Sequence, residues 1–305
     1  MGGYTSGGAG IQLHTDQEVR ISNCHVFGFQ FGLENQYPEN IITVYDSYFE
    51  TGLSYSGNGR GIYGLDTKTA TIVGCQGVIN ESNGQGYGLD LQTTGSGKIH
   101  IVNSDFINKS PASSYGQCFK LIGSPANNEI YVSDVNIIVD TQNNNSGTSK
   151  ALNISGVTGS YFNNLYVEGY GAGTFNAISS SIVNSTFYQK HLSPGATTTV
   201  WTLNAAGNDN LYSNCTFEVD PEYNAYTADP IVTVYNTQRF HNSTFKGGKK
   251  SNFALTGSGD ANVELVGNRF INILTGITAS NVTDITTGYI DGKGNWEKTQ
   301  TTSRS

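Results

Sequence analysis

Short runs of alternating apolar and polar residues recur along the whole chain, and an alternation with a period of two predicts β-strands. Many runs end in Asn, Asp or Gly, then a small residue, then an aromatic or aliphatic residue, as in VRISNCHV, ITVYDSYF, IHIVNSDF and SSIVNSTF. The Asn, Asp or Gly marks a corner of the chain. The predicted corners are Asn23, Asp46, Gly74, Asn103, Asp134, Asn163, Asn184, Asn214, Asn242, Gly267 and Thr287.

These corners repeat at the spacing of a solenoid, from 20 residues between Gly267 and Thr287 to 31 between Asn103 and Asp134. A further strand precedes the corner strand in almost every repeat, as in GIQLHT, FGLENQ, YGLDTK, YGLDLQ, CFKLIG and KALNIS. Two or three short strands per repeat indicate a parallel β-helix, in which stacked repeats bury a common core. The expected fold class is therefore all-β, a parallel β-helix solenoid of about eleven rungs.

The stacking also predicts what the recurring polar residues do. Asn at a corner tolerates the left-handed conformation of a sharp turn, and its amide can hydrogen-bond the Asn of the next rung. Cys24, Cys75 and Cys215 follow the corner, at a place where other rungs have Ser. Cys24 and Cys75 lie two rungs apart, roughly 10 Å, which is too far for a disulfide. We expect free thiols.

Composition narrows the function classes. Among 305 residues there are 38 Gly and only 13% charged residues, with a net charge of −8. No basic stripe appears, so nucleic acid is not an expected partner. The longest aliphatic run, at 137–139, is far shorter than the ~20 residues of a membrane span, so no membrane insertion is expected. A hydrophobic fraction of 36% argues against a disordered chain.

The Leu-x and I-x-N-S-x-F ladders resemble the right-handed parallel β-helix of the pectin-lyase-like superfamily. The composition, rich in Gly, Asn, Ser and Tyr, is most similar to that of viral tailspikes and tail appendages that bind or cut surface glycans. This resemblance of architecture covers about residues 10 to 295. It implies a phage or virus tailspike-type depolymerase at the virion surface or outside the cell, with host surface polysaccharide as partner and a homotrimeric assembly.

Such tailspikes usually open with a D-x-G-A-x-G-D-G-x-x-D-D-T-like segment that feeds a capping helix, and this sequence does not contain it. Either the sequence is a fragment of a longer chain or its N-terminal cap is supplied elsewhere, and we expect a fragment. We expect residues 1–296 to form a single β-helix domain and residues 297–305 to form a polar tail.

Ionisable residues gather at one position of the further strand, directly after its buried apolar residue. Down successive rungs this position holds His14, Glu34, Asp66, Asp90 and Lys120. Outward residues on adjacent parallel strands lie about 4.8 Å apart, so the sequence predicts a charged column. Mutual repulsion among the three carboxylates would raise the pKa of one of them, as a general acid requires.

The column predicts glycoside hydrolysis, with Glu34, Asp66 and Asp90 as catalytic residues and no cofactor or metal. Adjacent Asp66 and Asp90 would suit a retaining reaction, whose carboxyl groups are about 5 Å apart. The wider pair of Glu34 and Asp90 would suit an inverting one, at about 6.5 to 9.5 Å. Asp66 or Glu34 is the expected acid, and Asp90 the nucleophile or base.

Substrate-binding roles are predicted for His14 and Lys120, which can hold an anionic sugar, and for Tyr55 and Tyr115, in loops that enter the charged strand. By its resemblance to pectate lyases, the column can instead hold Ca²⁺ against a uronate, with Lys120 as the base. Two further alternatives stay open. The column can bind glycan or ions without turnover, or it can be a solvated strip of salt bridges on a structural or adhesive fibre.

Overall fold

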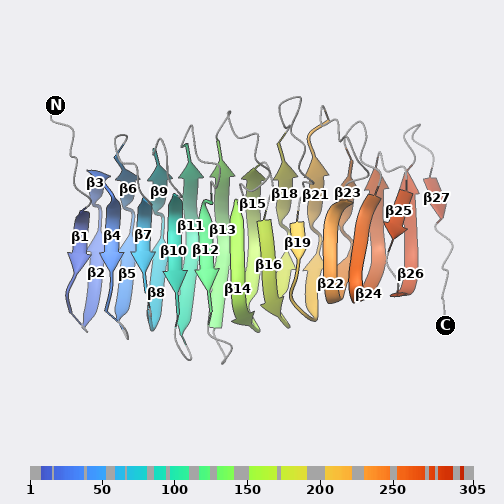
Figure 1. Ribbon diagram of the computed structural model, residues 1–305, viewed down its shortest axis with the longest axis horizontal. Helices are drawn as coiled ribbons and strands as arrows, with labels where there is room; N and C mark the ends of the chain where they lie inside the picture. Colours follow the sequence, from blue (N-terminus) through green and yellow to red (C-terminus); the bar gives the residue numbers. More distant parts are fainter. Residues whose placement is uncertain are drawn as a thin grey trace.

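The chain folds as a parallel β-helix, seen in a computed structural model (Figure 1). The structure describes residues 8–15, 17–37, 40–52, 59–65, 67–80, 86–93, 97–109, 117–123, 129–140, 151–169, 173–190, 203–221, 230–247, 253–271, 275–278, 281–290 and 296–298. All regular elements within these ranges are strands. No helix long and apolar enough to cross a membrane occurs among the described residues.

Each turn of the chain, here called a rung, passes through three parallel sheets, here called the first, second and third faces. The first face contains β1 (Ala9–Leu13), β4 (Phe31–Asn35), β7 (Arg60–Gly64), β10 (Tyr87–Gln92), β12 (Phe119–Ile122), β14 (Leu152–Thr158), β16 (Gly173–Ile178), β19 (Leu203–Ala205) and β25 (Thr275–Thr278).

The second and third faces follow in the same order along the chain. The second face contains β2 (Glu18–Ser22), β5 (Ile41–Tyr45), β8 (Thr69–Val73), β17 (Ser181–Val183) and β20 (Asn210–Ser213). The third face contains β3 (His25–Phe29), β6 (Tyr48–Thr51), β9 (Gln76–Ile79), β18 (Thr186–Gln189), β21 (Thr216–Val219) and β23 (Thr244–Lys246).

Longer strands run through more than one face. The second and third faces share β11 (Lys98–Asn108), β13 (Glu129–Val139), β15 (Tyr161–Gly169) and β26 (Asn281–Ile290), whereas β22 (Pro230–His241) joins the first and second and β24 (Phe253–Ile271) joins all three. At the red end of the molecule, β27 (Trp296–Lys298) pairs antiparallel with β26 (Figure 1).

The core lies inside the coil and is built from columns of like residues. On the third face, the rings of Phe187, Phe217, Phe245 and Phe270 stack with centroids 5.0 to 5.3 Å apart. All four side chains are buried. Because each rung covers the apolar residues of the next, a single rung has no core of its own.

The predicted corners separate the second face from the third. Corner residues from Asn23 to Gly267 have positive φ angles, between 45° and 65°. One assignment was wrong, since the sixth corner is Asn164 and not Asn163. Register explains the difference, because Val135 pairs with Leu165 and thereby aligns Asp134 with Asn164. Thr287 lies in β26, where the register with β24 shifts.

The residue after the corner forms the expected ladder of small polar side chains. Ser47 Oγ accepts a hydrogen bond from the Cys24 backbone N–H at 3.1 Å, and Ser104 Oγ accepts from the Cys75 N–H at the same distance. The Cys75 thiol donates to the Val73 carbonyl at 3.4 Å, as a serine there would. All four cysteines are free thiols, which confirms the prediction for the three at corners.

Candidate functional site

The strand register on the first face determines which outward side chains are neighbours. Gln12 pairs with Glu34, Glu34 with Tyr63, Tyr63 with Asp90, and Asp90 with Lys120. These five residues, here called the first-face column, therefore occupy successive strands of one sheet. The register brings together three of the residues predicted from the sequence, which are Glu34, Asp90 and Lys120.

Tyr63 occupies the place that the sequence predicted for Asp66. The sequence segments Tyr63-Gly-Leu-Asp66 and Tyr87-Gly-Leu-Asp90 look equivalent, but the structure aligns Arg60-Gly-Ile-Tyr63 with Tyr87-Gly-Leu-Asp90. In this register a Cβ added at Gly61 would lie 2.6 Å from the Gly88 carbonyl oxygen. Only a glycine fits at that approach. Asp66 lies outside the described residues, and the strand neighbour of Asp90 on β7 is Tyr63.

His14 is the second correction. It follows the end of β1 and is exposed, with its ring centroid 6.0 Å from that of Tyr37. Gln12 takes its place beside Glu34 and donates a hydrogen bond from Nε2 to Glu34 Oε2 at 3.1 Å. Gln36 donates to the other oxygen, Oε1. Two amides therefore hold the Glu34 carboxylate, whose residue is only 4% exposed.

Asp90 is the electrostatic centre of the first-face column. Its side chain is completely buried, and its Oδ2 accepts a hydrogen bond from Arg60 Nε at 2.8 Å. Lys120 Nζ lies 3.1 Å from Oδ1. One carboxylate thus faces two cations, where the sequence predicted three stacked carboxylates. A buried ion group of this kind is stable only because each charge keeps its partner.

Aromatic rings surround the cations. The guanidinium carbon of Arg60 lies 4.5 Å from the Tyr63 ring centroid and 5.4 Å from that of Tyr87, while Lys120 Nζ lies 5.1 Å from the latter. Such contacts stabilise cations that have left water. Burial raises the pKa of Tyr87, and the charge of Asp90 adds to this while Arg60 opposes it. The Tyr87 hydroxyl therefore stays neutral.

Arg60 was missed by the sequence reasoning, although a signal for it exists. A Gly followed by Ile or Leu recurs in the first strands, at 10–11, 32–33, 61–62 and 88–89. Gly64-Leu65 is a further dipeptide of this kind, and only the alignment on Gly61-Ile62 gives the observed register. Arg60 then falls between Phe31 and Tyr87, directly beside the column.

The remaining predicted residues are not placed. Tyr55 and Tyr115 lie outside the described residues, so their stacking on sugars stays a prediction. Within the described ranges, no group of three or more His, Cys, Asp or Glu is arranged to hold a metal ion.

The third face carries another polar network. Lys190 Nζ lies 2.7 Å from Glu168 Oε1, and Tyr166 donates a hydrogen bond to Glu168 Oε2 at 2.6 Å. Two rungs along, Lys246 pairs with Glu218 at 2.5 Å. Each of these carboxylates is neutralised by a lysine, which is typical of a solvated salt-bridge strip.

Comparison of the chain with protein-family models, with curated proteins and with solved structures finds no match.

Proposed function

We propose that this chain is a virus tailspike-type protein that binds a host surface polysaccharide along the first face and cleaves it by glycoside hydrolysis. The observation that carries the proposal is the shared outward row of Glu34, Tyr63 and Asp90. Two strand spacings separate the backbones of the two acids, roughly 10 Å. Carboxyl groups about 6.5 to 9.5 Å apart suit an inverting reaction, which leaves room for the attacking water.

The surroundings of the two acids suggest their roles. Asp90 lies between the side chains of Arg60 and Lys120, and we assign it the part of the base that activates water. Glu34 is held by neutral amides only and is assigned the part of the acid that protonates the leaving oxygen. Tyr63 stands between them, where the sugar ring would lie.

Access to Asp90 sets a condition on this mechanism. The Asp90 side chain is fully buried, while those of Arg60 and Lys120 are 17% and 16% exposed. One of these two long side chains must swing away when the polymer binds. An acidic sugar can drive this movement, because its carboxylate competes for the same cations.

The experiment is to incubate the purified chain with host surface polysaccharide and to follow polymer length and reducing ends. We expect the wild-type chain to shorten the polymer and Glu34→Gln to lose this activity. Glu129→Gln is the matched control, because Glu129 is 60% exposed on the second face. Equal cleavage by wild type and Glu34→Gln would contradict the assigned site, and ultraviolet-absorbing unsaturated products would indicate a lyase.

The full burial of Asp90 favours a second candidate, a structural or adhesive fibre without turnover. In that case the ion group of Arg60, Asp90 and Lys120 only stabilises the first face. Neither wild type nor Glu34→Gln would shorten the polymer, and both would bind it equally. Sedimentation of the polymer with the protein measures this binding directly.

A further inference from the structure

In its middle part, between Asp134 and Asn214, the corner row between the second and third faces forms side-chain hydrogen bonds between rungs. Asn164 Nδ2 donates to Asp134 Oδ1 at 2.7 Å, and Asn214 Nδ2 donates to Asn184 Oδ1 at 3.4 Å. In these rungs one corner side chain provides the partner of the next. The row therefore leaves little hydrogen-bonding capacity for any other molecule there.

The row of corner side chains is interrupted at Gly74, which has no side chain to offer. Its φ angle is +65°, and a Cβ at this position would lie 2.4 Å from Asp46 Oδ1. A hollow of about 420 Å³ lies beside this break and opens to the surface. It is lined by Asn23, Cys24, His25, Asp46, Ser47, Tyr48, Gly74 and Gln76.

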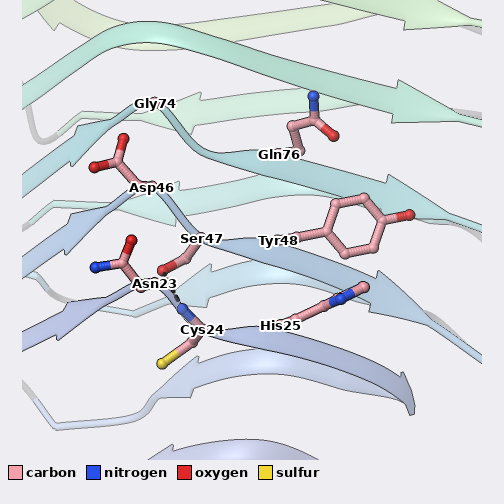
Figure 2. A pocket seen from close by; sticks show the side chains of 8 residues that line it. All are labelled: Asn23, Cys24, His25, Asp46, Ser47, Tyr48, Gly74 and Gln76. Atoms are coloured by element: carbon pink, nitrogen blue, oxygen red, sulfur yellow. Dashed lines mark hydrogen bonds between the residues drawn. The ribbon is translucent and has the colours of Figure 1, made fainter.

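Figure 2 shows how the lining is divided. Asn23 and Asp46 project from the corner on one side, and His25, Tyr48 and Gln76 project from the third face on the other. The His25 and Tyr48 rings meet edge to face, with centroids 4.5 Å apart. They form an aromatic wall opposite the corner amide and carboxylate.

Three polar groups of this lining have unused hydrogen-bonding capacity. Within the part of the chain that the structure describes, the side chains of Asn23, Asp46 and His25 make no hydrogen bond or ion pair with protein. Tyr48 differs, because its hydroxyl donates to Glu50. Burial and this bond raise the pKa of Tyr48 to about 12, so the ring stays neutral and fixed.

These groups discriminate between classes of ligand. Among the described residues, the Asp46 carboxylate forms no ion pair, so it repels anions, and no group of side chains is arranged to hold a metal ion. A carboxylate only accepts hydrogen bonds, whereas an amide both donates and accepts. Neighbouring hydroxyls of a sugar also do both, and they match this combination.

We propose that the hollow between the corner row and the third face is a binding site for one neutral sugar residue. Asp46 accepts hydrogen bonds from two neighbouring hydroxyls, Asn23 donates to a ring or hydroxyl oxygen, and the aromatic wall contacts the carbon face. The site is distinct from the first-face column and does not require that the chain cleaves anything. An experiment can therefore contradict sugar binding in the hollow without contradicting the proposed hydrolysis, and the reverse is also true.

The test is an NMR titration of the purified chain with methyl glycosides of glucose, galactose and mannose. The His25 imidazole signals, assigned by comparison with His25→Gln, report on the hollow. We expect saturable shifts with at least one glycoside, with a dissociation constant on the order of millimolar. Asp46→Asn should weaken binding by about tenfold, as expected when hydrogen bonds to a charged group are lost.

Gly74→Asn is the sharper variant, because asparagine tolerates a positive φ and would complete the corner row over Asp46. It fills the hollow without changing the charge, and the His25 shifts should disappear. Gly267→Asn is the matched control, since Gly267 also has a positive φ, of 64°, and also faces a corner residue, Asn242. It should bind as wild type does.

Three outcomes would overturn the proposal, two from the neutral glycosides and one from glucuronate. The first is that no glycoside shifts the His25 signals, and the second is that Gly74→Asn binds as tightly as Gly267→Asn. Stronger shifts with glucuronate than with glucose would show that the ligand class is wrong. Circular dichroism of each variant confirms that the β-helix is retained.

Discussion

The carboxylate of Asp90 on β10 lies 2.8 Å from Nε of Arg60 on β7, one rung away, and its side chain is completely buried. We predict that Asp90→Asn lowers the free energy of unfolding by about 3–5 kcal/mol, because Arg60 and Lys120 would remain buried without their counter-charge. Denaturant unfolding measures this loss. The exposed Lys98 and Glu129 pair is the comparison, and Glu129→Gln should cost no more than about 1 kcal/mol. Equal costs would contradict the assigned burial.

The Phe217 ring stacks between those of Phe187 and Phe245, at 5.3 and 5.0 Å between centroids. We predict that Phe217→Ala lowers the free energy of unfolding by about 3–5 kcal/mol, through lost burial and the cavity left behind. Phe27→Ala removes the same ring from the same face, but Phe27 is 65% exposed. Its cost should stay within about 0.5 kcal/mol, again measured by denaturant unfolding.

The thiols should differ in reactivity. Burial raises the pKa of both Cys118 and Cys215 to about 12, so only about 10⁻⁴ of each is thiolate at pH 8. Burial also raises the pKa of Cys75, whereas Cys24 is only half buried. Iodoacetamide at pH 8 should therefore alkylate Cys24 first and the other three only after unfolding. Mass spectrometry of peptides identifies the modified residues, and early labelling of Cys118 would contradict the prediction.

Asp134 should make the stability of the fold depend on pH, with lower stability in acid. Hydrogen bonds from Asn164 and then Ser133 lower the pKa of Asp134 below its ordinary value. Because the folded pKa is the lower one, this stabilisation is fully present above the unfolded pKa and is lost as the pH falls through the folded pKa. Melting temperatures between pH 5 and 2 should fall less steeply for Asp134→Asn than for wild type. Parallel curves would show that Asp134 contributes nothing.

Patterns among nearby residues predicted those parts of the fold that are formed within a single rung. Alternating residues show which side chains enter the core, and a polar residue before a small one marks the corner, as at Asn23 and Cys24. The free thiols could be predicted as well, since cysteine replaces serine in a ladder of small residues. All of this depends on neighbours in the chain, where alternation and turn chemistry act.

Sequence patterns alone thus predict a β-helix with its corners, and Glu34 and Asp90 as outward acids. Which side chains lie next to each other depends on how the rungs stack. Tyr63 pairs with Asp90, at the place predicted for Asp66, and Gln12 rather than His14 pairs with Glu34. Register depends on contacts between rungs, and these join residues that are far apart in the sequence, such as Gly61 and the Gly88 carbonyl. The two similar YGLD segments, at 63–66 and 87–90, do not show by themselves which glycines lie against each other in neighbouring rungs.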